Sequence, residues 1–131
     1  MIALDTNVVV RVITRDDPEQ ARRAAALMKD HDLWLSKTVV LETEWVLRYT
    51  YGFAAAAVNR ALSTLAGLQN LTLEDASSVA AALAWHERGM DFSDALHMAG
   101  SVQAASVFAT FDRRLARAAA RAGGALQVSL V

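Results

Sequence analysis

The sequence predicts an α/β fold in which a central parallel sheet of about five strands is flanked by helices in three layers. Segments with strand character alternate with segments of helical periodicity along the chain, which is typical of a parallel sheet. The chain has 131 residues, of which 54% are hydrophobic, and a single proline. This composition supports a folded core, and the length fits one domain that spans residues 1–131.

The N-terminal half should contain two strand–helix units before a weak third strand. A short strand is expected at Met1 to Asp5, followed by a helix at Asn7 to Thr14. The next helix starts at Asp17, because proline follows this acidic cap and Gln20 completes a capping box; it should end near Lys29. The elements expected next are a strand at 33–35, a helix from Ser36 or Thr38 to Gly52, a helix at 54–66 and a strand at 71–73.

The C-terminal half continues the alternation. Asp75 can cap a fifth helix that ends at Gly89, and Ser93 can cap a sixth helix from Asp94 to about Gln103. The last expected elements are a strand at 106–110, a helix at 113–122, a turn at Gly123–Gly124 and a strand at 126–130.

Composition excludes several classes of protein. The chain has no cysteine, which excludes disulfides and a thiolate zinc site and fits a reducing cytosol, and its three histidines lack zinc-ligand spacing. Asp5 interrupts any signal-peptide core, and no run of about 20 apolar residues could span a bilayer. We therefore expect a soluble, cytoplasmic protein. The formal net charge of -1 gives no bulk attraction to nucleic acid.

Four acidic residues occupy positions that suggest a metal site: Asp5, Glu42, Asp94 and Asp112. Asp5 and Asp112 each follow a predicted strand, and ligands bind at the carboxyl ends of strands in open α/β sheets. A carboxylate cluster needs protons or a hard cation to neutralise it, and oxygen ligands suit Mg²⁺ or Mn²⁺. Metal-assisted phosphoester chemistry is the function that this pattern favours.

Glu42 and Glu44 compete for a role on the third helix. Glu44 is four residues before Arg48, in the favourable order for a surface ion pair. Glu42 is expected to project among apolar residues that include Trp45 and Tyr49, where a lone carboxylate is costly. Its partner would be a metal or a buried arginine, so Glu42 is the candidate ligand.

Asp94 and Asp112 also have plain structural explanations. Asp94 falls in the first turn of its helix, where the helix terminus stabilises an anion, and Asp91 adds a further ligand, outer-shell partner or loop acid. Asp112 is an ordinary helix start. The arginines that follow Asp112 are candidates to contact an RNA backbone, or they form a solvated helix face: Arg113, Arg114 and Arg117.

Four segments resemble the acidic motifs of PIN-domain ribonucleases. The run Ile2-Ala3-Leu4-Asp5-Thr6-Asn7 is similar to the opening of that family, and the segment from Thr38 to Leu47 resembles its glutamate-bearing helix. The segments Met90–His97 and Ala109–Asp112 resemble the third and fourth motifs. Their order, spacing and total length are similar to those of the VapC-type toxins of prokaryotic toxin–antitoxin modules.

This resemblance implies a PIN fold and a metal-dependent endoribonuclease that uses Mg²⁺ or Mn²⁺ and forms a homodimer. It also implies an RNA substrate, products with a 5′-phosphate and a 3′-hydroxyl, and inhibition by a VapB-like antitoxin. Carried over by position, Asp5, Glu42, Asp94 and Asp112 would be the catalytic and metal-binding quartet, with Asp5 and Asp94 ranked first as direct ligands. The positions that would support this site are Thr6, Asn7, Asp91 and Thr110.

Three alternatives remain open from the sequence. A PIN nuclease could act in RNA processing without a toxin role. A receiver-like regulatory domain would also bind Mg²⁺ in an acidic pocket, but it needs a lysine near that pocket, and Lys29 and Lys37 are poorly placed for this. A non-catalytic binding module would use its acids only as caps and surface charge, which leaves Glu42 unexplained.

Overall fold

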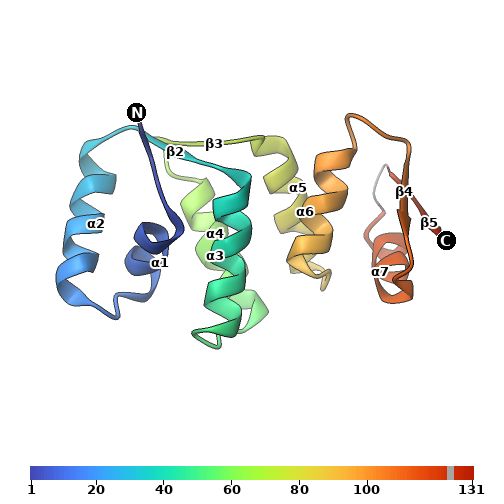
Figure 1. Ribbon diagram of the computed structural model, residues 1–131, viewed down its shortest axis with the longest axis horizontal. Coiled ribbons are helices and arrows are strands. Elements are labelled where there is room, and N and C mark those ends of the chain that lie inside the picture. Colours follow the sequence, from blue (N-terminus) through green and yellow to red (C-terminus); the bar gives the residue numbers. More distant parts are fainter. Residues whose placement is uncertain (124–125) are drawn as a thin grey trace. The chain divides into compact units, whose positions relative to one another are not determined.

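A computed structural model describes residues 1–123 and 126–131 of the chain (Figure 1). The chain divides into two compact units, Met1–Ala76 and Ser77–Val131, and each is described by itself. The single domain expected over residues 1–131 stays a prediction. Of the turn expected at Gly123–Gly124, Gly124 lies outside the described residues. None of the described helices is long and apolar enough to cross a membrane.

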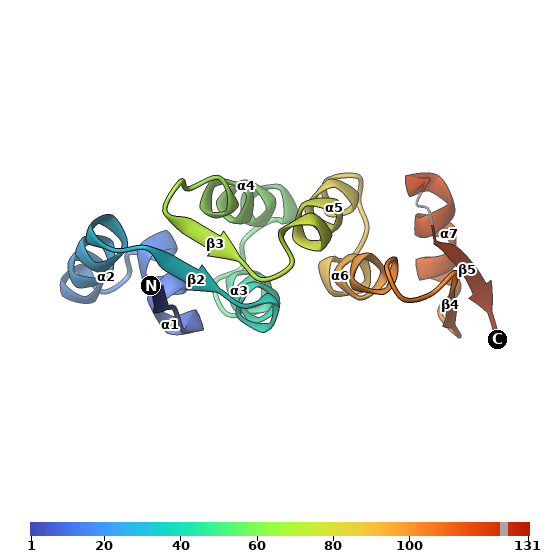
Figure 2. The ribbon, with the colours of Figure 1, turned by 90° about the horizontal axis from the view of Figure 1, so that it is seen from above.

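The first unit contains a parallel sheet of three strands, in the order β1-β2-β3. In its register, Ile2 is paired with Leu33, and Leu33 with Leu71. Helix α1 packs against α2 and α3, α3 packs against α4, and α4 lies beside β3 (Figure 2). The elements of this unit are β1 (Ile2–Ala3), α1 (Thr6–Thr14), α2 (Pro18–Asp30), β2 (Leu33–Leu35), α3 (Lys37–Tyr49), α4 (Ala55–Ala66) and β3 (Leu71–Leu73).

Helix ends in the first unit follow the local signals of the sequence. Asp17 caps α2 by accepting a hydrogen bond of 3.0 Å from the Gln20 backbone, as expected. Ser36 rather than Thr38 caps α3. The helix ends at Tyr49, and Gly52 closes it with a φ of 69°, a left-handed conformation that glycine adopts without strain. The largest fully buried side chains here include Val9, Leu33, Leu35, Leu47 and Val58.

The second unit contains a parallel pair of strands and three helices. Its elements are α5 (Ala76–Glu87), α6 (Phe92–Ser101), β4 (Val107–Thr110), α7 (Arg113–Ala122) and β5 (Gln127–Leu130), and α5 begins at the last residue of the first unit. Val107 of β4 is opposite Gln127 of β5, and α7 packs against both strands. Phe92 is buried, and the His86 ring meets it edge-on at 5.5 Å between ring centroids.

The α/β class is confirmed, but the expectation of one sheet of about five strands is wrong. Within the described residues the five strands form one sheet of three and one of two, and all their pairs are parallel. Strand β1 has two residues and pairs with β2, while β4 pairs with β5. Hydrophobic patterning locates strands along a chain but does not specify their partners, so the number of sheets could not be deduced from it.

Candidate functional site

Asp5 forms the N-terminal cap of α1. Its Oδ1 accepts a hydrogen bond of 2.8 Å from the Thr6 backbone, and its backbone carbonyl accepts from Val8 and Val9. The side chain is exposed, so it can also meet a ligand. This capping role was not expected from the sequence, although Asp is among the residues that most favour the cap position.

Two buried threonine hydroxyls adjoin the proposed acids of the first unit. Thr6 follows Asp5 and is 6% exposed, and Thr43 follows Glu42 and is fully buried. Within the described part of the chain, neither Oγ1 atom has a hydrogen-bond partner. Because an unpaired buried hydroxyl is costly, each position is suited to an ordered water or to a ligand atom. Thr6 was among the expected supporting residues, whereas no sequence signal marked Thr43.

The expected placement of Glu42 on a buried apolar face is wrong. Helix α3 buries Val40, Thr43, Glu44 and Leu47, which follow the spacing of one helical face. Glu42 lies outside this face and is exposed. Trp45 and Tyr49, its expected apolar surroundings, are 54% and 63% exposed. Glu42 therefore has the solvent access that a metal ligand needs, but it lacks the apolar surroundings that the sequence predicted.

Glu44 forms the expected ion pair with Arg48, but the pair is not on the surface. The Glu44 side chain is 2% exposed and accepts hydrogen bonds of 2.8 Å from Arg48 Nε and 3.0 Å from Nη2. The Arg48 guanidinium also lies 4.4 Å from the centroid of the Tyr49 ring. Both Glu44 oxygens are thus engaged inside the first unit, which gives this residue a structural role.

Asp91 rather than Ser93 caps α6, which corrects the expected start of this helix. Oδ1 of Asp91 accepts hydrogen bonds of 3.1 Å from the Asp94 backbone and 2.6 Å from the Ser93 hydroxyl. The helix begins at Phe92, two residues earlier than the Ser93 cap would require, and Phe92 is buried in its first turn. Asp91 is exposed, and its cap interactions bring its carboxylate close to the N-terminus of α6.

Asp94 is placed in an electrostatically crowded position. Partial burial, followed by the charges of Asp91 and Asp112, raises the pKa of the Asp94 carboxyl, while His97 and Arg114 act in the opposite direction. Asp94 is half-buried in the first turn of α6, as expected. The second unit thus brings Asp91, Asp94 and Asp112 within electrostatic reach of one another. A cation near Asp94 would relieve this repulsion.

Asp112 has the helix-start geometry that the sequence allowed. Its Oδ1 accepts hydrogen bonds of 2.8 Å from the Arg114 backbone and 3.1 Å from the Leu115 backbone, and so caps α7. The Asp112 backbone donates to the Thr110 hydroxyl at 3.0 Å, which fixes the turn between β4 and α7. Arg113, Arg114 and Arg117 are exposed on α7; their contact with RNA stays a prediction.

The proposed quartet is divided between the units. Asp5 and Glu42 belong to Met1–Ala76, and Asp94 and Asp112 to Ser77–Val131. Across residues 1–123 and 126–131, no group of three or more His, Cys, Asp or Glu side chains is arranged to hold a metal ion. The metal-binding roles of these residues therefore stay predictions.

A comparison with known families decides the class of the protein. The model of the PIN-domain family matches residues 2–121. The chain belongs to the PIN-domain family. The match runs through both units and includes Asp5, Glu42, Asp94 and Asp112. PIN domains are in general nucleases, so this chain has a nuclease-type fold. No curated protein matches the chain.

Proposed function

We propose that this PIN domain is a metal-dependent endoribonuclease that hydrolyses phosphodiester bonds in RNA. The observation that carries the proposal is the electrostatic repulsion of Asp94, in the first turn of α6, by Asp91 and by Asp112, the cap of α7, in a chain that matches a family of nucleases. Repulsion among carboxylates at one place suits a polyvalent cation. The family match supports a nuclease, and the repulsion around Asp94 supports the proposal that a cation binds near this residue.

The donor set fits a hard divalent cation. Asp5 and Glu42 are the proposed ligands from the first unit, and both are exposed. Asp94 and Asp112 are those from the second unit. All four offer carboxylate oxygens, which suit Mg²⁺ or Mn²⁺. The unpartnered hydroxyl of Thr6, next to Asp5, supplies a further polar atom at one of these positions.

The proposed reaction is direct hydrolysis without a protein nucleophile. An ion held by these carboxylates would supply activation of water and stabilisation of the negative charge that develops on the phosphate. A carboxylate of the quartet accepts the proton of the attacking water. The bond from phosphorus to the 3′-oxygen breaks, and the leaving oxygen takes a proton from solvent water, which gives a 5′-phosphate and a 3′-hydroxyl. Arg113, Arg114 and Arg117 position the RNA through its phosphates.

The proposal includes a biological role. We assign the protein as the toxin of a type II toxin–antitoxin module, acting as a homodimer and inhibited by a VapB-like antitoxin. This role is supported by the order and spacing of the four acidic motifs along the chain. Co-purification with the product of the adjacent gene, and loss of nuclease activity in that complex, would support it.

The experiment that tests the nuclease is cleavage of a mixed RNA pool by the purified protein. Fragments should appear with Mg²⁺ or Mn²⁺ and be absent with EDTA. Asp5→Asn should remove the activity, and Asp30→Asn, an exposed acid at the end of α2, should keep it as a matched control. Cleavage by Asp5→Asn at the wild-type rate would contradict the assignment of Asp5.

A further inference from the structure

A groove with a cavity volume of about 650 Å³ lies within the first unit, against α1 and α2. This volume is in the range of sites that hold small ligands. Its lining residues come from the two helices alone: Asn7, Val8, Arg11, Gln20, Arg23, Ala24 and Leu27. None of them is acidic, although the chain as a whole carries a formal net charge of -1.

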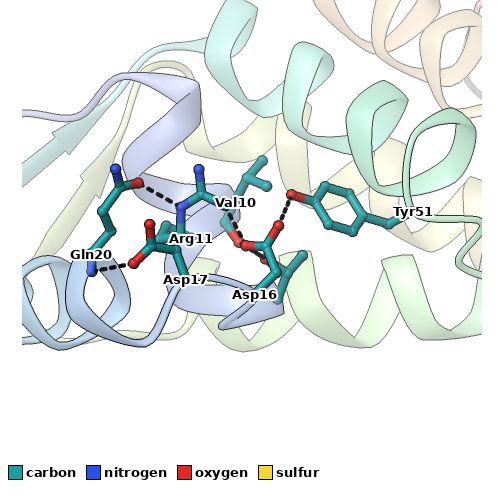
Figure 3. Close-up of polar contacts among 7 residues, drawn as sticks. Val10, Arg11, Asp16, Asp17, Gln20 and Tyr51 are labelled. Carbon is teal, nitrogen blue, oxygen red and sulfur yellow. Dashed lines mark hydrogen bonds and ion pairs between the residues drawn. The ribbon is translucent and has the colours of Figure 1, made fainter.

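The polar side of the groove is held in place by a hydrogen-bond network (Figure 3). Arg11 Nε donates to Gln20 Oε1 at 2.9 Å, so the Gln20 oxygen is occupied and its amide NH₂ remains as a donor. Arg11 also forms an ion pair with Asp16, which in turn accepts a hydrogen bond of 2.6 Å from Tyr51. Arg11 and Gln20 are therefore fixed donors, and the charge of Arg11 is balanced by Asp16.

Arg23 supplies the unbalanced positive charge of the groove. In the described part of the chain no residue forms a hydrogen bond or an ion pair with its guanidinium. The neighbouring Arg22 differs, because its Nη2 and Nε bind Glu19 at 2.8 and 3.3 Å on the exposed side of α2. Arg22 and Arg23 are adjacent on α2, but only Arg23 lines the groove and only Arg22 is paired with Glu19.

The groove also has an apolar wall, which is formed by Val8, Ala24 and Leu27. A site with several hydrogen-bond donors, one free guanidinium and an apolar wall matches a nucleotide, which carries a phosphate together with a sugar and a flat base. The groove also includes Asn7, two positions after Asp5, the proposed acid of this unit. A nucleic acid strand that reached Asp5 would have this groove beside it.

We propose that the groove between α1 and α2 binds a nucleotide of the single-stranded RNA substrate, with Arg23 on its phosphate. The proposal rests on the proposed nuclease function, which makes RNA the occupant. An acidic peptide has the same charge but no base to place against the apolar wall, so the mixed lining favours RNA.

The test is the affinity of the full chain for a fluorescein-labelled single-stranded oligoribonucleotide, measured by anisotropy in EDTA so that no cleavage occurs. Arg23→Glu should weaken binding about tenfold or more, since it removes a charge-assisted hydrogen bond. Arg22→Glu, the matched control, should change binding less than about twofold. Arg23→Gln should lower the slope of log K against log salt by about 0.7. Circular dichroism confirms that each variant is folded.

Equal effects of Arg23→Glu and Arg22→Glu would overturn the proposal. It would also be overturned if Arg23→Glu lost affinity for an oligoglutamate peptide while keeping its affinity for RNA. Failure of the proposed nuclease activity can be distinguished from failure of the groove proposal. If the wild-type protein binds RNA through Arg23 but never cleaves it, the groove binds RNA and the proposed activity is wrong. If the wild type and Arg23→Glu cleave RNA with the same KM, the proposed nuclease activity is supported and RNA binding in the groove is contradicted.

Discussion

Glu44 is buried against Arg48, with two hydrogen bonds of 2.8 and 3.0 Å between its carboxylate and the guanidinium. Glu42, two positions earlier on α3, is exposed and has no comparable partner among the described residues. One helix therefore carries two glutamates in opposite environments. Variants of the two glutamates can therefore be compared to separate effects on stability from effects on catalysis.

Glu44→Gln should destabilise the protein by about 2–3 kcal/mol, because it leaves Arg48 without the charge of Glu44 in a buried pair. The loss is smaller than for a fully buried pair, since the Arg48 side chain is 33% exposed. Glu42→Gln should change the free energy of unfolding by less than about 0.5 kcal/mol, yet remove RNA cleavage. Urea denaturation measures both variants. Equal loss of stability in the two would contradict the assignment of their environments.

Asp94→Asn should raise the melting temperature slightly at pH 7 in EDTA. Burial and the charges of Asp91 and Asp112 raise the pKa of Asp94 in the folded state, so its charged form destabilises the fold at pH values above that pKa. The neutral amide removes this penalty. The same variant should lose most of the increase in Tm that Mn²⁺ gives the wild type, because a ligand stabilises only the state that binds it. Thermal melts with Asp30→Asn as control check both effects; a lower Tm in EDTA would contradict the crowding.

Tyr51→Phe should make stability less dependent on pH in the acidic range. The hydrogen bond from Tyr51, followed by that from Arg11, lowers the pKa of Asp16 to about 2. Asp16 therefore stabilises the fold at pH values above its ordinary pKa, and this contribution is lost as the pH falls towards 2. The variant should be less stable than wild type at pH 7, and the difference should shrink below pH 4. Denaturation at pH 7, 4 and 2.5 tests this; a constant difference would refute the coupling.

Thr43→Val should stabilise the protein by about 1 kcal/mol, because it replaces a buried hydroxyl that lacks a partner with a methyl group of similar shape. RNA cleavage should be unchanged. Thr6→Val should have a similar effect on stability but should slow cleavage, since Thr6 adjoins Asp5. Urea denaturation and a cleavage assay on the same preparations separate the two threonines. Equal activity of both variants would remove Thr6 from the supporting residues.

Local signals in the sequence predicted helix ends well. Asp17 and Pro18 start α2 as expected, and Gly52 closes the segment after α3. These signals work because a cap or a left-handed turn depends on a few neighbouring residues. Pairing between strands depends on the whole fold, which explains why the division into sheets of three and two strands could not be predicted.

The sequence predicted which residues form the candidate site better than it predicted the surroundings of each residue. Helix α3 carries apolar residues around most of its circumference, so its periodicity did not show that Val40 and Leu47 face the core while Trp45 faces outward. Because the sequence predicted the wrong buried face for α3, Glu42 was expected to be buried, although it is exposed. The electrostatic influence of Asp112 on Asp94 could not be derived from spacing either, because it depends on how the second unit folds α6 relative to the turn between β4 and α7.

The most direct test of the central claim is single-turnover cleavage of one mapped RNA fragment in Mn²⁺. It compares the wild type with Asp5→Asn, Glu42→Gln, Asp94→Asn and Asp112→Asn, each shown to be folded. The account predicts that wild-type cleavage stops in EDTA and that each variant cuts at least about 100-fold more slowly. Cleavage by all four variants at the wild-type rate, or undiminished wild-type cleavage in EDTA, would contradict a metal-dependent nuclease built on these acids.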